Sequence, residues 1–197
     1  MISRETFDIV RSRYGYQASW AIWGEQIDKP KSGMGDLTIF DDQNFDNIAH
    51  VLHTNFVIVA LNISTIDIEF PLSNFHGTNG EVYKLRFAVR NSPLWGCYIT
   101  DVLKDYKDSK SVSVANFLQT PEGQIFEQEN VHSFAQEIVD VGAENATLIA
   151  LGADVERILR RHFSRSHKIV RAPHYGMPTN KENYRDRFWK SIGDINN

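Results

Sequence analysis

The segment Asn55–Ile63, NFVIVALNI, is a nearly unbroken run of apolar and mostly β-branched residues. A strand with one face in water alternates apolar and polar residues, so an unbroken run predicts a strand that is buried on both faces. Such strands are typical of the centre of a parallel sheet that is covered by helices on both sides. This segment therefore favours an α/β fold.

The rest of the chain alternates between strand and helix patterns. Further strands are expected over Ser19–Trp23, Gly96–Leu103, Ala146–Leu151 and Lys168–Arg171. Helices are expected over Glu5–Arg13, Asp46–His53, Glu81–Arg90, Asp154–Phe163 and Lys181–Ile192, with one or two more inside Pro121–Val141. This alternation predicts a three-layer sandwich around a central, mostly parallel sheet. No repeat or linker divides the 197 residues, so a single domain over residues 1–197 is expected.

Composition narrows the kind of protein. The lone cysteine, Cys97, excludes an internal disulfide and any zinc or iron–sulfur site built on cysteines, which favours a reducing compartment. Because Cys97 lies in an apolar strand, we expect a buried small side chain rather than a nucleophile. The first residues are charged, unlike a signal peptide, and no apolar run approaches the roughly 20 residues of a membrane helix. These features predict a soluble, cytoplasmic protein without a membrane partner.

No cofactor is expected. The chain contains neither a P-loop nor a GxGxxG motif. His50 and His53 have the i, i+3 spacing of a ligand pair, but no carboxylate or third histidine accompanies them, so a metal site is not expected.

Charge is distributed unevenly along the chain. Between Glu156 and Lys190 there are ten Lys or Arg and three Asp or Glu, a net charge of +7, although the whole chain carries −4. The remainder therefore carries −11, that is −4 less +7. A basic segment on an acidic body is typical of a surface that meets a polyanion, and the alternative is a solvated basic helix face.

Polar residues follow several of the predicted strands. Ligands of parallel sheets bind beyond the carboxyl ends of the strands, so these residues are candidates for one shared site. The strand ends read ALNIS (60–64), ITDVLKD (99–105), LG (151–152) and RAPHYG (171–176). Asn62, Asp101 and His174 are thus expected at one edge of the sheet, with Phe75 and His76 on an intervening loop.

This set of strand ends resembles the uracil-DNA glycosylase superfamily over roughly residues 56–176. ALNIS stands at the place of the first motif, with Asn62 at its variable position, and CYITDVLKD is similar to a segment that reads approximately YITNVVKC in the thermostable branch. LIALGADVERIL is similar to the strand, glycine and helix before the second motif, and APHYG places His174 on the histidine of His-Pro-Ser. The resemblance implies a uracil-DNA glycosylase-like α/β fold and hydrolytic excision of a base during DNA repair.

The sequence departs from the family pattern at several positions. Ala60 and Ile63 replace the Gly and Pro of the first motif, and Tyr175 and Gly176 replace the Pro-Ser of the second. With Cys97 alone the chain cannot bind the iron–sulfur cluster of the thermostable branch. The eroded first motif favours an alternative, a catalytically silent relative that binds nucleic acid or a small nucleotide ligand.

Within this resemblance, His174 and Asn62 are the expected catalytic pair. His174 would donate a hydrogen bond to the departing base, and Asn62 would hold the attacking water. Phe75 would stack on the flipped base, and Tyr175 is placed with it among the substrate-binding residues. The alternatives are ordinary structural roles: a loop histidine bonded to a carbonyl, a strand-end Asn bonded to the next turn, and an aromatic core residue.

Asp101 stands where the thermostable branch has an Asn that reads the base. An ionised Asp only accepts hydrogen bonds, so it would favour a base with an amino group over uracil. The alternative is an Asp that caps the next helix or turn.

Four basic residues are expected to contact the phosphate backbone of DNA: Arg171, Lys168, Arg160 and Arg161. If they do, DNA affinity falls steeply with salt, whereas a flat salt dependence returns them to the solvated helix face.

Overall fold

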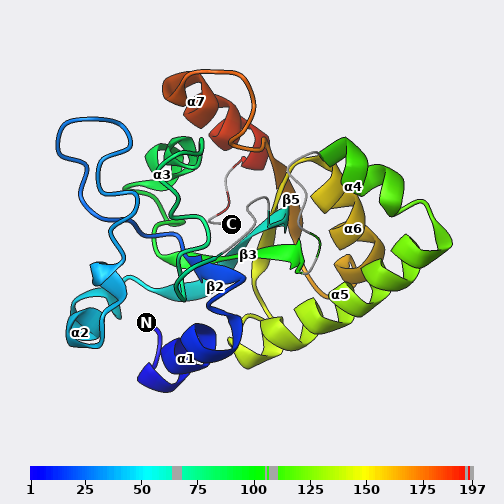
Figure 1. Cartoon of the computed structure of the whole chain (residues 1–197), viewed down its shortest axis with the longest axis horizontal. Helices are drawn as coiled ribbons and strands as arrows, with labels where there is room; N and C mark the ends of the chain where they lie inside the picture. The colour runs from blue at the N-terminus through cyan, green and yellow to red at the C-terminus, as the bar shows by residue number, and fades with distance from the viewer. Residues whose placement is uncertain (64–67, 105, 107–110, 194, 196–197) are drawn as a thin grey trace.

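In the computed structural model, a central sheet lies between two layers of helices (Figure 1). The structure describes residues 1–63, 68–104, 106, 111–193 and 195. In this part the strands are β1 (Ala18–Trp20), β2 (His53–Asn62), β3 (Cys97–Leu103), β4 (Thr147–Leu151) and β5 (Ile169–Ala172). Their order in the sheet is β1-β3-β2-β4-β5. Only the pairing of β1 with β3 is antiparallel among these strands.

The helices cover both faces of the sheet. They are α1 (Arg4–Ile9), α2 (Phe45–Ile48), α3 (Tyr83–Val89), α4 (Ser111–Phe117), α5 (Pro121–Asp140), α6 (Ala153–Phe163) and α7 (Lys181–Ile192), with a π-helix η1 (Val10–Tyr14) and 3-10 turns η2 (Thr38–Phe40) and η3 (Asp42–Asn44). Helices α1, α5 and α6 pack on one face, and α3 and α7 pack on the other (Figure 1). The predicted three-layer α/β fold with a mostly parallel sheet is confirmed.

Alternation along the strands creates the two hydrophobic cores. Val57 and Val59 of β2 face the α5/α6 core, whereas Ile58 and Ala60 face the α3/α7 core. All four are buried, because the strand is covered on both sides. The prediction of a doubly buried central strand is therefore confirmed. By the same period of two, Asn62 and Asp101 belong to the α3/α7 face.

Some predicted boundaries differ from the structure. The helix expected over Asp46–His53 is the short α2, because His53 N–H donates to Gly96 O and thereby joins the sheet. The strand expected over Ser19–Trp23 ends at Trp20. The segment Pro121–Val141 forms the single helix α5, which Thr120 caps by accepting a hydrogen bond from the Gly123 N–H. The last helix, Lys181–Ile192, has its predicted bounds.

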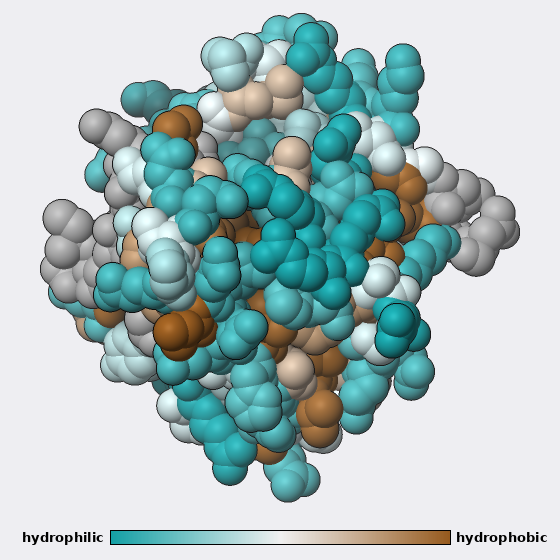
Figure 2. Space-filling model, turned by 90° about the vertical axis from the view of Figure 1, so that its right-hand side faces the viewer, coloured by the Kyte–Doolittle hydropathy of each residue, from teal (hydrophilic) through white to brown (hydrophobic). Residues whose placement is uncertain are grey.

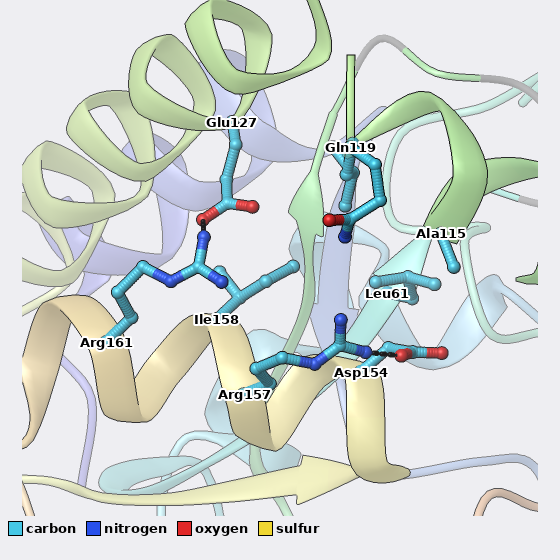
Figure 3. Close-up of a pocket in the computed structure, with 9 residues that line it drawn as sticks. Leu61, Ala115, Gln119, Glu127, Asp154, Arg157, Ile158 and Arg161 are labelled. Carbon is cyan, nitrogen blue, oxygen red and sulfur yellow. Dashed lines mark hydrogen bonds and ion pairs between the residues drawn. The ribbon is translucent and has the colours of Figure 1, made fainter. Parts of the chain in front are cut away.

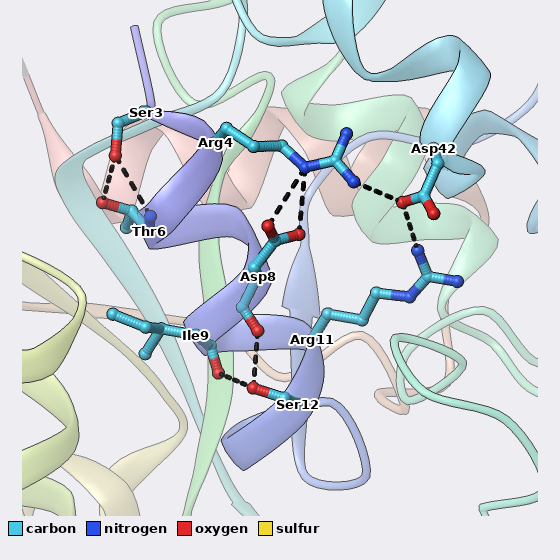
Figure 4. A network of polar contacts seen from close by, with 8 residues as sticks. All are labelled: Ser3, Arg4, Thr6, Asp8, Ile9, Arg11, Ser12 and Asp42. Carbon is cyan, nitrogen blue, oxygen red and sulfur yellow. Dashed lines mark hydrogen bonds and ion pairs between the residues drawn. The ribbon is translucent and has the colours of Figure 1, made fainter.

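Surface ion pairs tie the N-terminal helix to the short turn η3. Arg4 and Arg11 both donate to Asp42 Oδ1, at 2.6 and 2.9 Å, and Arg4 also contacts Asp8 (Figure 4). All of these side chains are exposed, so these ion pairs are screened by water and add little to stability.

A buried polar network lies beneath helix α5. Glu137 is fully buried, and its carboxylate accepts hydrogen bonds from Tyr98 and Thr100, both at 2.7 Å. The buried Lys104 forms an ion pair with the same carboxylate at 2.6 Å. The outer surface over α4, α5 and α6 is mainly hydrophilic, with hydrophobic residues in separate patches (Figure 2).

Candidate functional site

A cleft of about 550 Å³ opens at the carboxyl edge of the sheet. It lies between the loop 68–80, which follows β2, and Tyr175, which follows β5. Its walls combine aromatic and polar side chains: Phe70, Ser73, Asn74, Phe75, His76, Thr78, Asn79 and Tyr175. Its volume is within the roughly 300–1,000 Å³ of sites that bind small ligands.

The loop that forms one wall of the cleft is anchored firmly to the region of β1. Phe75 O accepts a hydrogen bond from Trp23 Nε1 at 3.0 Å, and Leu72 O accepts one from Ser19 Oγ at 2.8 Å. Leu72 and Phe75 have positive φ angles of 65° and 69°. Such backbone conformations are costly for residues other than glycine and cluster at binding sites. The loop is therefore held by hydrogen bonds to Ser19 and Trp23.

Asp101 lies directly behind this wall. It is 1% exposed, and its Oδ2 accepts a hydrogen bond from Asn74 Nδ2 at 2.8 Å. Burial raises the pKa of Asp101 to about 7, partly opposed by the Asn74 hydrogen bond and the positive charge of Lys104. Asp101 does not line the cleft, whereas Asn74 does. The sequence led us to expect that Asp101 reads a base directly, but in the structure it contacts Asn74 and does not itself line this cleft.

A buried serine–histidine pair supports the same wall. Ser19 donates its hydroxyl proton to Leu72 O, so the contact of 2.9 Å with His76 Nε2 requires the histidine to donate. Among the residues that the structure describes, His76 Nδ1 then has no hydrogen-bond partner. Burial lowers the pKa of His76 to about 3, so the ring is neutral at physiological pH.

His174 packs against Tyr175 at the opposite wall. The two rings lie 4.1 Å apart between centroids, and His174 Nδ1 accepts a hydrogen bond from the Gly176 N–H at 3.0 Å. The neutral ring must therefore carry its proton on Nε2. Although His174 is exposed, atoms around the ring desolvate it, and this together with the charge of Lys84 lowers its pKa. Burial and the nearby Asp101 raise the pKa of Tyr175.

A buried lysine holds the turn that carries His174 and Tyr175. Lys84 of α3 is 2% exposed, and its Nζ donates to Met177 O at 2.8 Å and to Thr179 O at 3.1 Å. The turn is also held by Tyr184 of α7, whose hydroxyl donates to Pro173 O at 3.0 Å. These contacts fix the turn against the two helices of the α3/α7 face.

Asn62 is the last residue of β2, at the expected edge of the sheet. Its Nδ2 donates to Tyr106 O at 2.9 Å and to Ile63 O at 3.3 Å, as in a strand-end asparagine that holds the following loop. It does not line the described cleft. Ser64 of ALNIS and Asp105 of ITDVLKD lie outside the described residues.

The basic residues that were expected to contact phosphates lie away from the cleft. Arg160 and Arg171 both form ion pairs with Glu156, at 2.9 and 3.2 Å. Arg161 forms an ion pair with Glu127 at 2.8 Å, beside a pocket of only about 10 Å³ between α5 and α6 (Figure 3). These contacts lie on the α6 face, and Lys168 precedes β5 at the amino edge of the sheet.

The structure thus groups some of the predicted site residues and separates others. Phe75 and Tyr175 line one cleft, Asp101 lies behind it, and His174 packs on Tyr175. Asn74, which holds Asp101, was not predicted, because only its position immediately before Phe75 in PLSNFHG could have indicated it. Cys97 is fully buried, as predicted, and burial raises its pKa.

Comparisons with protein-family models, curated proteins and solved structures found no match to this chain. Within the described residues, no helix is long and apolar enough to cross a membrane. In the same part of the chain, no group of three or more His, Cys, Asp or Glu is arranged to hold a metal ion.

Proposed function

We propose that this protein binds a nucleobase or nucleotide in the cleft at the carboxyl edge of its sheet, as a divergent relative of the uracil-DNA glycosylases. The observation that carries the proposal is the pairing of Phe75 and Tyr175, one hundred positions apart in sequence, on the walls of one cleft. Phe75 is 7% exposed and belongs to the α3/α7 core, so Tyr175 offers the more accessible stacking face, worth about 1–3 kcal/mol per base. Polar atoms of Asn74 and Thr78 in the same cleft supply contacts for the edge of the base.

Base excision is a second candidate, and the state of His174 favours it. Its Nδ1 accepts from Gly176, so a neutral ring carries its proton on Nε2, and this ring packs on Tyr175 of the cleft wall. In hydrolytic excision, the oxygen of water bonds to the sugar carbon C1′ and the glycosidic bond breaks. Its electron pair leaves with the base, where a donor such as His174 Nε2–H would stabilise the developing charge, and the proton that the water loses ends on the released base.

The silent relative remains the main alternative to excision. The hydrogen bonds of Asn62 Nδ2 to Tyr106 O and Ile63 O match the structural alternative for that side chain, a strand-end asparagine bonded to the next turn. Excision therefore depends on His174, and binding does not.

Calorimetric titration with 2′-deoxynucleosides tests the binding proposal. We expect saturable binding that weakens at least about fivefold in Tyr175→Leu, because the variant loses an aromatic face. Tyr16→Leu, which removes an exposed tyrosine outside the cleft, is the matched control and keeps the affinity of the natural chain. If no nucleoside binds, the proposal is wrong.

Excision is tested separately on DNA. Oligonucleotides that contain uracil, hypoxanthine, xanthine or a mismatch are incubated with the protein, and alkali then cleaves any abasic site. Activity that is lost in His174→Ala and retained in His132→Ala, an exposed histidine on α5, supports the enzyme. Binding without release of any base supports the silent relative.

A further inference from the structure

The side-chain amide of Asn74 is fixed in one orientation. Its Nδ2 donates to Gln17 O and to Asp101 Oδ2, both at 2.8 Å. A backbone carbonyl cannot donate a hydrogen bond, and neither can an ionised carboxylate, so the amide nitrogen must point toward these two acceptors.

The amide oxygen of Asn74 is left for a ligand. No hydrogen bond among the described residues uses Asn74 Oδ1. This oxygen is also not one of the fully buried side-chain atoms that lack a partner, so part of its surface is accessible. Asn74 is only 8% exposed, yet it lines the cleft between Ser73 and Phe75. Asn74 Oδ1 is therefore a hydrogen-bond acceptor in a wall with little access to water. A bound ligand that offers no donor to this oxygen loses binding free energy.

We propose that Asp101 is a positioning residue, which orients Asn74 so that the cleft selects heterocycles with an exocyclic amino group over their oxo counterparts. An amino group donates to Asn74 Oδ1, whereas a carbonyl in the same place would face another acceptor and be repelled. This inference rests on the proposed function and adds the chemical class of the base.

The surroundings of Asp101 explain why it acts through Asn74. Its carboxylate is buried on β3, where Lys104 is the positive charge and Glu137 the negative charge that influence it. Tyr175 lies close enough for this carboxylate to affect its titration. Asp101 is only 1% exposed and does not contact a ligand itself. It acts by accepting the hydrogen bond that orients the Asn74 amide.

Matched nucleoside pairs test the inference on the natural chain. Deoxycytidine and deoxyuridine, and deoxyadenosine and deoxyinosine, each differ mainly by an amino or an oxo group. We expect the amino member of each pair to bind at least about tenfold more tightly at pH 8, the size of one hydrogen bond to a buried acceptor. Equal affinity within each pair, or preference for the oxo member, overturns the inference even if binding in the cleft is established. If no nucleoside binds at all, the proposed function fails first and this inference with it.

Two variants then separate positioning from a merely structural role. Asn74→Ala removes the acceptor, and the amino preference should fall to within about twofold, whereas Asn47→Ala, an exposed asparagine outside the cleft, should preserve it. Asp101→Leu removes the acceptor that holds Asn74 Nδ2, so the preference should narrow and the side-chain amide resonances of Asn74 should move. Unchanged resonances together with an unchanged preference refute the role of Asp101. If a variant does not fold, the side-chain amide resonances of Asn74 in the natural chain test its orientation. Both Asn74 N–H protons should be protected from exchange, and rapid exchange of either proton would contradict the orientation.

Discussion

Replacing Asp101 by asparagine should change how stability depends on pH. Burial raises the pKa of Asp101 from its ordinary value of 3.8 to about 7, so the folded protein binds a proton that the unfolded chain has released within this window. The free energy of unfolding contributed by Asp101 is therefore greatest below pH 3.8 and is lost as pH rises toward 7. At about 1.4 kcal/mol per pH unit, the loss amounts to roughly 4 kcal/mol.

His76 acts in the opposite direction over nearly the same window. Burial lowers its pKa from 6.5 to about 3, so the unfolded chain binds a proton that the folded state excludes. Its contribution is present above pH 6.5 and is lost as pH falls toward 3, an effect of roughly 5 kcal/mol. The two contributions nearly cancel between about pH 4 and 6.5, so the natural chain should show little net dependence from this pair.

Urea unfolding followed by tryptophan fluorescence at half-unit steps from pH 4 to 8 measures the effect. The stability of the natural chain minus that of Asp101→Asn should fall by roughly 4 kcal/mol between pH 4 and 7. A constant offset from the new amide does not alter this slope. A difference that is flat across the window would refute the reasoning, because it would mean that Asp101 titrates alike in the folded and unfolded states.

Three further stability predictions follow from buried groups. His76→Gln removes the opposing titration, so its free energy of unfolding should fall as pH rises from about 4 to 7, measured in the same urea series. Lys104→Met leaves the buried Glu137 side chain without its cationic partner, which should cost about 3–5 kcal/mol in chemical denaturation at pH 7, and Glu137→Gln in the same background should recover part of it. Gly96 has a φ of 83°, and a Cβ there would overlap Val51 O, so Gly96→Ala should destabilise the protein by about 2–4 kcal/mol and lower the midpoint of thermal unfolding.

Local patterns in the sequence were sufficient to predict most of the sheet and several helices. The run from Asn55 to Ile63 indicated a strand that is buried on both faces. The centre of β2 is buried in this way because helices cover the sheet on both sides. The helix Lys181–Ile192 was predicted with its observed ends, and Asn180 caps it through a hydrogen bond to the Asn183 N–H. These features depend on neighbours a few residues apart, which a sequence displays directly.

The walls of the cleft depend on contacts between distant residues, and these were not predictable from local patterns. Asn74 and Asp101 are 27 positions apart, and Lys84 reaches Met177 O across 93 positions. Neither a buried lysine on α3 nor an asparagine in a loop has a pattern that distinguishes it from an exposed one. Asp101 was correctly placed at the carboxyl end of its strand, but only the fold shows that Asn74 stands between it and the cleft.

The structure places the cleft and the basic arginines on different faces of the sheet, although the sequence had suggested that both serve one DNA-binding site. The cleft and His174 belong to the α3/α7 face, whereas Arg160, Arg161 and Arg171 belong to the α6 face and already hold Glu156 or Glu127. A basic residue that is paired with a carboxylate must give up that partner before it can neutralise a phosphate, which reduces its contribution to DNA affinity. The proposed recognition of a single base therefore does not depend on these three arginines, and a nucleoside is the more direct probe of the cleft than duplex DNA.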